Sequence, residues 1–153
     1  MLIQVDTREK PSQTERIFEH FDNQGVQYLI KKLDVGDYMS FSNIKCAIDR
    51  KQSIGEYAVN MGADHARFKR EMIRANENGI KLIFLIEDDK IKSIEDVKKW
   101  WNPNSMFHQR FMTGEMLYKG MNTQIERYGV EFHFCKKKET GYRIVELLKE
   151  NGG

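Results

Sequence analysis

The sequence predicts an α/β fold in which one central sheet is flanked by helices. Short strand-like segments alternate with amphipathic helical segments along the chain, and the most apolar of them, residues 80–86, has the character of a buried central strand. The element order that we expect is β-α-β-β-β-α-β-α-α-β-α. The 153 residues have the length of one domain, and no internal repeat or linker divides them.

The first part of the chain is expected to form four strands and one helix. Ser12 and Glu15 have the spacing of a capping box, so the helix is expected to begin there, and Gly25 is expected to stop it. A turn around Gly36 leads into the third strand, and Asn43 marks the turn into the fourth. The expected strands are residues 2–5, 26–32, 38–41 and 46–51.

The second part of the chain is expected to be richer in helix. Ser53 is placed to cap a short helix, and Phe68, Met72 and Ala75 recur at helical spacing until Gly79 ends the pattern. The expected elements are helices at 53–59 and 67–78, a strand at 80–86, a helix at 93–101, a loop at 102–105, a helix at 112–128, a strand at 130–135 and a helix from 141 onward.

Composition and charge exclude some classes of protein. Nine Phe, six Tyr and two Trp with only two Pro do not fit a disordered chain, and a net charge of +2 does not fit a histone-like protein that coats DNA. The near-neutral total hides a local separation of charge. Residues 1–37 carry a net charge of −2, whereas residues 38–80 carry +2. An acidic group next to a basic helix is therefore expected.

The cysteines and apolar runs indicate the compartment. Cys46 and Cys135 lack the spacing of a metal-binding pair, and two reduced thiols are favoured over one disulfide. Charged residues at 6–10 interrupt any signal peptide, and the longest apolar stretch, 82–86, is far shorter than the roughly 20 residues of a membrane span. We expect an intracellular protein, cytoplasmic in a bacterium or phage-infected cell, with no membrane partner.

An acidic constellation carries the expected chemistry. Asp37 begins one strand, and Asp49 and Lys51 share one face of the next because side chains on a strand alternate. If these strands pair as a hairpin, the two carboxylates and the ammonium come together. Two carboxylates suit Mg²⁺, which activates water for attack on phosphorus, while the lysine stabilises developing charge. A solvated strand face is the alternative interpretation.

The surrounding segments add a family resemblance. In chain order they are Val5-Asp6-Thr7-Arg8-Glu9, Gly36-Asp37-Tyr38, Asp49-Arg50-Lys51, Arg67-Phe68 and the apolar run 82–87. In order and spacing they resemble the XPF-type nuclease domain family of the PD-(D/E)xK superfamily. The sequence departs from the family at Asp49, where the family has glutamate, and at Gly55, where it has aspartate. Glu56 is a candidate substitute for that aspartate.

The resemblance implies a restriction-endonuclease-like fold, a central mixed sheet flanked by helices, and we expect a single nuclease domain at 1–153. The helix-hairpin-helix modules of the larger family members are not expected in this sequence. The resemblance also implies a set of catalytic residues and a metal cofactor, which would be Mg²⁺ or, as a substitute, Mn²⁺. Asp37 and Asp49 would hold the metal with Asp6 as a further ligand, and Lys51 would be the catalytic lysine. Glu9 would lie near them, and Arg8 and Arg50 would contact phosphate or brace the carboxylates.

A basic helix is the expected DNA surface. Arg67, Arg70 and Arg74 fall along one side of the helix at 67–78, with Lys69 nearby, and such a row can neutralise backbone phosphates. Arg50 and Ser53 complete the expected DNA contacts. An ordinary solvated helix face is the alternative interpretation of the row.

The predicted function is that of a metal-dependent DNA endonuclease. The resemblance implies flap, fork or junction DNA as the substrate, a role in DNA repair or recombination, a homodimer, and a bacteriophage or mobile element as the source. Two alternatives belong to other classes: a catalytically inactive domain of the same fold that binds nucleic acid or protein, and a regulatory α/β domain whose acidic strand ends are incidental.

Overall fold

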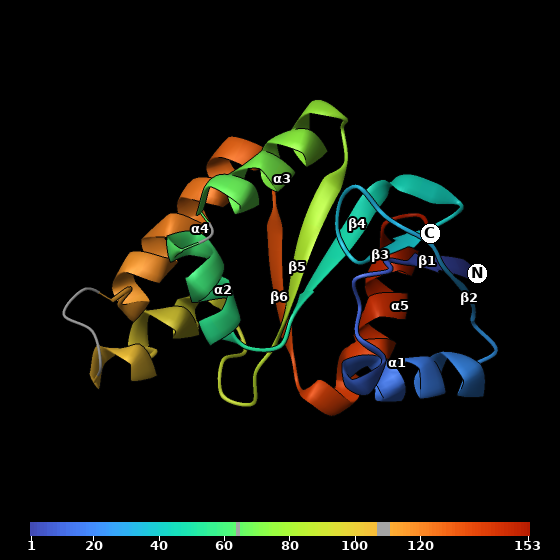
Figure 1. The fold of residues 1–153 in the computed structure, drawn as a ribbon, viewed down its shortest axis with the longest axis horizontal. Helices are drawn as coiled ribbons and strands as arrows, with labels where there is room; N and C mark the ends of the chain where they lie inside the picture. Colours follow the sequence, from blue (N-terminus) through green and yellow to red (C-terminus); the bar gives the residue numbers. More distant parts are fainter. Residues whose placement is uncertain (64, 107–110) are drawn as a thin grey trace.

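A six-stranded mixed sheet forms the centre of the computed structural model, which describes residues 1–63, 65–106 and 111–153 (Figure 1). Its strand order is β2-β1-β3-β4-β5-β6. The hairpin β3–β4 and the pair β1–β3 are antiparallel, and the other neighbours are parallel. The strands are β1 (Leu2–Val5), β2 (Gln27–Ile30), β3 (Tyr38–Ser40), β4 (Asn43–Lys51), β5 (Lys81–Glu87) and β6 (Glu131–Cys135).

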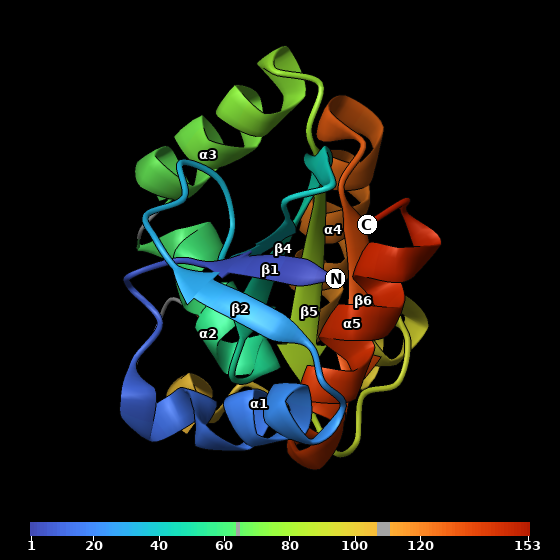
Figure 2. The same ribbon diagram turned by 90° about the vertical axis from the view of Figure 1, so that its right-hand side faces the viewer.

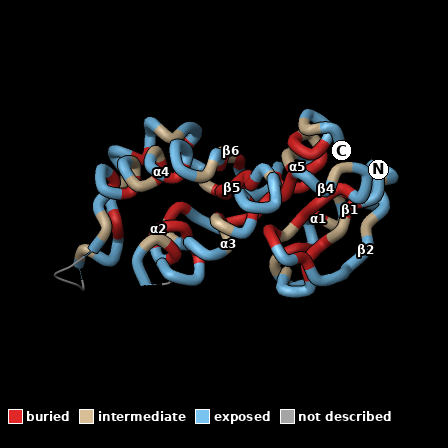
Figure 3. The backbone as a smooth tube through the Cα atoms, turned by 90° about the horizontal axis from the view of Figure 1, so that it is seen from above, coloured by how far each residue is buried: buried red, intermediate tan, exposed pale blue. Residues whose placement is uncertain are grey.

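Helices cover both faces of the sheet. On one face α1 (Pro11–Asn23) packs beside α5 (Thr140–Glu150). The other face carries α2 (Ile54–Gly62), α3 (His65–Glu77) and α4 (Gly114–Tyr128), and Figure 3 shows these three helices on the opposite side of the sheet from α1 and α5. The described residues also contain three short 3₁₀ helices: η1 (Ile94–Lys99), η2 (Pro103–Met106) and η3 (Lys137–Glu139).

The two helical layers enclose two apolar cores that share strand β5. Leu82, Phe84 and Ile86 pack into the core beneath α2, α3 and α4. Ile83 and Leu85, which point to the other face, pack into the core beneath α1 and α5. Because both faces are covered, the strand is apolar throughout instead of alternating, which is why the sequence marked it as central. The α/β prediction is confirmed.

Several predicted helix ends agree with the structure. The hydroxyl of Ser53 caps α2 by accepting a hydrogen bond from the backbone N–H of Glu56 at 3.0 Å. Gly79 and Gly129 follow α3 and α4 with positive φ angles of 65° and 64°, a conformation that favours glycine. The inward face predicted for the last helix is also found, since Ile144, Val145, Leu147 and Leu148 are all buried.

Other boundaries were predicted wrongly. The helix α1 begins at Pro11 with Lys10 as its N-cap, so Ser12 lies inside the first turn and no side chain caps this end. Proline is well suited to that first position, because it lacks the N–H that a cap would satisfy. Asn43 begins β4 instead of a turn, and the helix expected at 93–101 is only the 3₁₀ helix η1.

The connection between β2 and β3 matters most for the site. It runs over residues 31–37, and Figure 2 shows it rising from the sheet toward α3. This segment ends at Asp37, directly before β3. In the described residues no helix is both long and apolar enough to cross a membrane.

Candidate active site

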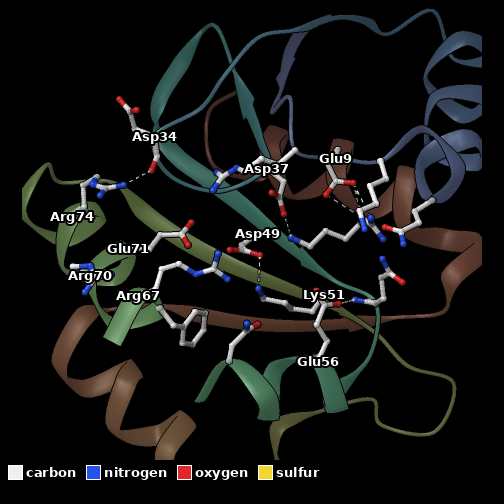
Figure 4. A pocket seen from close by; sticks show the side chains of 17 residues that line it. Glu9, Asp34, Asp37, Asp49, Lys51, Glu56, Arg67, Arg70, Glu71 and Arg74 are labelled. Carbon is white, nitrogen blue, oxygen red and sulfur yellow. Dashed lines mark hydrogen bonds and ion pairs between the residues drawn. The ribbon is translucent and has the colours of Figure 1, made fainter. Parts of the chain in front are cut away.

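A cleft of about 480 Å³ opens where β4 ends, between α3 and the segment that follows β1. Of its 17 lining side chains, all except Phe68 are charged or carry an amide (Figure 4). The three residues of the predicted acidic constellation, Asp37, Asp49 and Lys51, are among them. Such a polar cleft suits a highly charged ligand better than an apolar one.

The β3–β4 hairpin brings Asp37 to the end of β4. Tyr38 pairs with Ile48, and the backbone N–H of Asp37 donates to the carbonyl of Ile48 at 2.7 Å. The Asp37 carboxylate in turn accepts a hydrogen bond from the backbone N–H of Arg50 at 2.8 Å. The ammonium of Lys51 lies 3.2 Å from Oδ1 of Asp49. The structure thus brings together the three side chains whose proximity depended on hairpin pairing.

Burial and neighbouring charges shift the pKa values of Asp37 and Lys51. Burial, followed by the charges of Asp49 and Glu9, raises the pKa of Asp37 well above its ordinary value. Burial acts to lower the pKa of Lys51, but the carboxylates of Asp49 and Asp37 outweigh it, so that the pKa of Lys51 is raised. Burial and the neighbouring carboxylates therefore disfavour the ionised form of Asp37, and a cation bound beside it would favour that form.

A buried ion-pair network lies next to the carboxylates. The guanidinium of Arg50 contacts Oε2 of Glu9 at 2.8 Å and Oε1 of Glu87 at 2.7 Å, and all three side chains are buried. The two glutamates hold the pKa of Arg50 above its ordinary value although burial opposes this. With both ends of its guanidinium engaged by carboxylates, Arg50 is arranged to brace the site, which favours that role over the expected contact with DNA.

Asp6 is placed differently from the expectation. Its carboxylate accepts hydrogen bonds from the backbone N–H groups of Leu33 at 2.7 Å and Arg8 at 3.1 Å, and it is ion-paired with the Arg8 guanidinium. Asp6 is fully buried and is not among the residues that line the cleft. The structure therefore uses this carboxylate to anchor two loops and does not bring it to the expected metal position.

The residues that line the cleft suit a divalent metal held by two carboxylates. In the described residues no three His, Cys, Asp or Glu side chains are grouped closely enough to hold a metal alone. Mg²⁺ commonly takes only one or two carboxylates and completes its shell with water and phosphate oxygens. Asp37 and Asp49 offer carboxylate oxygens in the same cleft, and their charges interact, so the donor set fits such an ion.

A sequence model of the ERCC4 domain matches residues 5–147, which is most of the chain. The chain belongs to the ERCC4-domain family. Two similar solved structures are XPF from Aeropyrum pernix, with 19% identity and a TM-score of 0.67, and the same protein in complex with DNA, with 20% identity and a TM-score of 0.66. No curated protein sequence matches.

The similarity to these two structures extends over 100% and 98% of this chain. It covers only 62% and 64% of the two XPF chains, so this chain spans less than two thirds of their length. The restriction-endonuclease-like fold and the resemblance to XPF-type nuclease domains are confirmed. The ERCC4 family is a family of nucleases.

The ERCC4 domain presents most of its predicted basic helix to the cleft. Arg67, Arg70 and Arg74 on α3 line it, whereas Lys69 is not among the lining residues. Ser53 is occupied in capping α2 and also lies outside the lining set. The side chain of Arg8 also lines the cleft and is 62% exposed.

Glu56 lies in the first turn of α2 and also lines the cleft. Its Oε2 accepts a hydrogen bond from the backbone N–H of Gln52 at 2.6 Å. The carboxylate therefore stabilises the turn that follows Lys51. This is the residue that the sequence offered as a substitute for the family aspartate at Gly55.

Six polar residues that line the cleft were missed by sequence reasoning, and two of them, Glu71 and Asn60, have notable surroundings. Glu71 on α3 accepts a hydrogen bond from the backbone N–H of Gly36 at 3.0 Å, and burial followed by the charge of Asp49 raises its pKa. Its spacing from Arg67 and Arg74 would have revealed that it shares their face. Asn60 on α2 also lines the cleft, and its buried Oδ1 has no hydrogen-bond partner in the described residues.

Proposed function

We propose that this ERCC4 domain is a divalent-metal-dependent DNA endonuclease that hydrolyses phosphodiester bonds in the cleft. One observation carries the proposal: the β3–β4 hairpin holds Asp37 close to the end of β4, where Asp49 is paired with Lys51. Two carboxylates beside an ammonium form a site for a hard cation and a phosphate. The membership of a nuclease family supports the same conclusion.

Asp37 and Asp49 would hold Mg²⁺, with Mn²⁺ as a substitute. When bound, the ion supplies Lewis-acid chemistry at a phosphate oxygen and an activated water. The ammonium of Lys51, 3.2 Å from Asp49 and with a raised pKa, carries positive charge at neutral pH. It can therefore stabilise the negative charge that develops on the phosphoryl oxygens in the transition state. Arg50, paired with Glu9 and Glu87, would keep the strand end rigid.

The basic side chains of the cleft would bind the DNA backbone. Arg67, Arg70 and Arg74 on α3 line it, and Arg8 and Lys10 line it as well. Guanidinium and ammonium groups neutralise phosphates without reading the bases, so this binding would be sensitive to salt and insensitive to sequence. Flap, fork or junction DNA is the proposed substrate and a homodimer the proposed state in solution. Both follow from family membership.

Cleavage assays test the proposal. Wild type, Asp37→Ala and Lys51→Ala are incubated with branched, single-stranded and duplex DNA while Mg²⁺ is titrated. Wild type is expected to cut at least one substrate only when Mg²⁺ is present, and each variant is expected to lose cutting while keeping its affinity for DNA. Wild type that cuts none of them contradicts the proposal. Retained binding would then indicate an inactive DNA-binding domain, and loss of binding a regulatory domain.

A further inference from the structure

The loop at residues 31–37 delivers Asp37 to the cleft and is tethered at several points. At its start, the N–H of Leu33 donates to Asp6 at 2.7 Å. Further on, Nη1 of Arg74 donates to the carbonyl of Asp34 at 2.9 Å, and the N–H of Gly36 donates to Oε1 of Glu71 at 3.0 Å. Two of these tethers come from α3, three residues apart on one face of that helix.

Gly36 lies against β4 with no room for a side chain. Its φ angle is +72°, and a Cβ atom there would lie 3.0 Å from both the Cβ of Ala47 and the carbonyl oxygen of Ile48. The backbone is therefore seated directly on β4 on one side and bonded to Glu71 on the other. Since Asp37 is the next residue, the position of its carboxylate depends on how firmly the Gly36 peptide is held.

The helix α3 thus has two kinds of side chain on its cleft face. Arg67, Arg70 and Arg74 line the cleft, where the proposed function places DNA. Figure 4 shows Glu71 on the same helix, directed toward Asp49 and the Asp37 loop. A shift of α3 would move the arginines and the Gly36 tether together, because a helix moves as a rigid element.

We propose that Glu71 is a positioning residue: its bond to the Gly36 amide holds Asp37 in its metal-binding place from the helix that also carries Arg67, Arg70 and Arg74. The inference rests on the proposed nuclease function. It assigns Glu71 a role through hydrogen-bond acceptance at Oε1, which a glutamine retains, and not through negative charge. A third metal-binding carboxylate is the competing role, and it would require the charge.

Glu71→Gln and Glu71→Ala separate these roles, with Glu77→Gln and Glu77→Ala as matched controls. Glu77 lies on the same helix, is exposed and does not line the cleft. The first readout is amide hydrogen exchange at Gly36 by NMR. Loss of one such hydrogen bond is expected to speed exchange about tenfold in Glu71→Ala and to leave it near the wild-type rate in Glu71→Gln. If Glu71→Ala does not fold, Glu71→Met, which preserves side-chain length, replaces it.

The second readout is Mg²⁺ binding by calorimetry, and the third is single-turnover cleavage with saturating DNA. Glu71→Ala is expected to weaken Mg²⁺ binding and slow cleavage, each by about tenfold, as is typical when a partner that orients a metal ligand is lost. Its DNA affinity should change less than twofold, or about 0.4 kcal/mol. Glu71→Gln should retain most of the wild-type Mg²⁺ affinity and cleavage rate.

Two results would overturn the inference. If Glu71→Gln weakens Mg²⁺ binding as strongly as Glu71→Ala, the charge matters and Glu71 acts as a ligand. If Glu71→Ala leaves Gly36 exchange and Mg²⁺ binding unchanged, the tether has no positioning role. Wild type that cuts no DNA would instead be a failure of the proposed function. Exchange and calorimetry need no cleavage, so they would still decide whether Glu71 positions Asp37 for metal.

Discussion

The backbone N–H of Arg50 donates a hydrogen bond to Oδ2 of Asp37 across 2.8 Å. This contact joins two segments that are 13 residues apart in the chain, and it places the carboxylate beside the strand that carries Asp49 and Lys51. The position of Asp37 is thus set by strand pairing and by a backbone donor. The site is therefore largely arranged before any ligand binds, at the cost of an electrostatic repulsion within it.

Replacing Asp37 by Asn is expected to stabilise the metal-free protein while abolishing cleavage. Burial and the charges of Asp49 and Glu9 raise the pKa of Asp37, so its ionised form is disfavoured in the folded state. For such a group, stability falls as pH rises from the ordinary value of 3.8 through the folded pKa. Asn stays neutral and can still accept from Arg50. Urea unfolding at pH 8 should show a gain of at least about 1 kcal/mol.

Magnesium provides the control for that prediction. Saturating Mg²⁺ should stabilise the wild type and not Asp37→Asn, because only the carboxylate gains from the ion. As the pH falls below the folded pKa of Asp37, the advantage of the variant should shrink, and it should disappear below about 3.8. A variant that is less stable than wild type at pH 8 in metal-free buffer would contradict the proposed repulsion.

Replacing Lys51 by Met is expected to lower stability at neutral pH by about 1–3 kcal/mol, because the carboxylate of Asp49 loses a charged partner. Although burial acts to lower the pKa of Lys51, Asp49 and Asp37 raise it above 10.5. A raised lysine pKa contributes stability that is fully present below 10.5 and is lost as pH rises through the folded pKa. The stability difference between the two proteins, followed by urea unfolding, should therefore shrink above pH 10.5. A difference that is independent of pH would speak against the ion pair.

Replacing Arg50 by Met is expected to cost about 3–5 kcal/mol of unfolding free energy, since Glu9 and Glu87 would be left as buried charges without their partner. Arg50→Lys should recover only part of this loss, because an ammonium cannot reproduce the planar fork that reaches both carboxylates. Arg16→Met serves as an exposed control and should stay within about 0.5 kcal/mol of wild type. Equal stability of Arg50→Met and wild type would rule out the bracing role.

Replacing Gly36 by Ala is expected to be more damaging than replacing Gly25 by Ala. Both glycines have positive φ angles, 72° and 66°, so each variant pays a backbone penalty of about 1–2 kcal/mol. A Cβ at Gly36 additionally lies 3.0 Å from Ala47 and Ile48, whereas a Cβ at Gly25 meets nothing within 4 Å. Thermal unfolding of the matched pair isolates the crowding. Similar melting temperatures would mean that the loop before Asp37 yields easily.

Replacing Arg70 by Ala is expected to weaken DNA binding and to reduce the salt slope of log K by about one. Arg70 lines the cleft, whereas Lys69, its neighbour on α3, does not, so Lys69→Ala should change the slope less. Fluorescence anisotropy from 50 to 200 mM salt, a range in which counterion release is readily measured, gives both slopes. Equal slopes for the two variants would place the bound DNA elsewhere on the surface.

The local pattern of the sequence accounted for much of the fold and part of the site. The unbroken apolar run at 82–86 marked the central strand, and glycines at 79 and 129 marked helix ends. Strand alternation put Asp49 and Lys51 on one face, where they are ion-paired. These features depend on neighbours in the chain, so a sequence contains them directly. The Ser12 cap failed because Pro11 competes for the same helix end by an equally local rule.

Contacts between distant segments were decided only by tertiary packing. Asp6 bonds to Leu33 instead of facing the cleft, Arg50 reaches Glu87 across 37 positions, and Glu71 reaches Gly36 across 35. Each of these depends on how loops and helices dock on the sheet, which is a balance of packing over the whole core and not a property of the few residues involved. The sequence by itself therefore determined which residues could form a metal site and a basic helix. The pairing of β3 with β4, together with the docking of α3 and of the loop at 31–37, decided which carboxylates meet in the cleft.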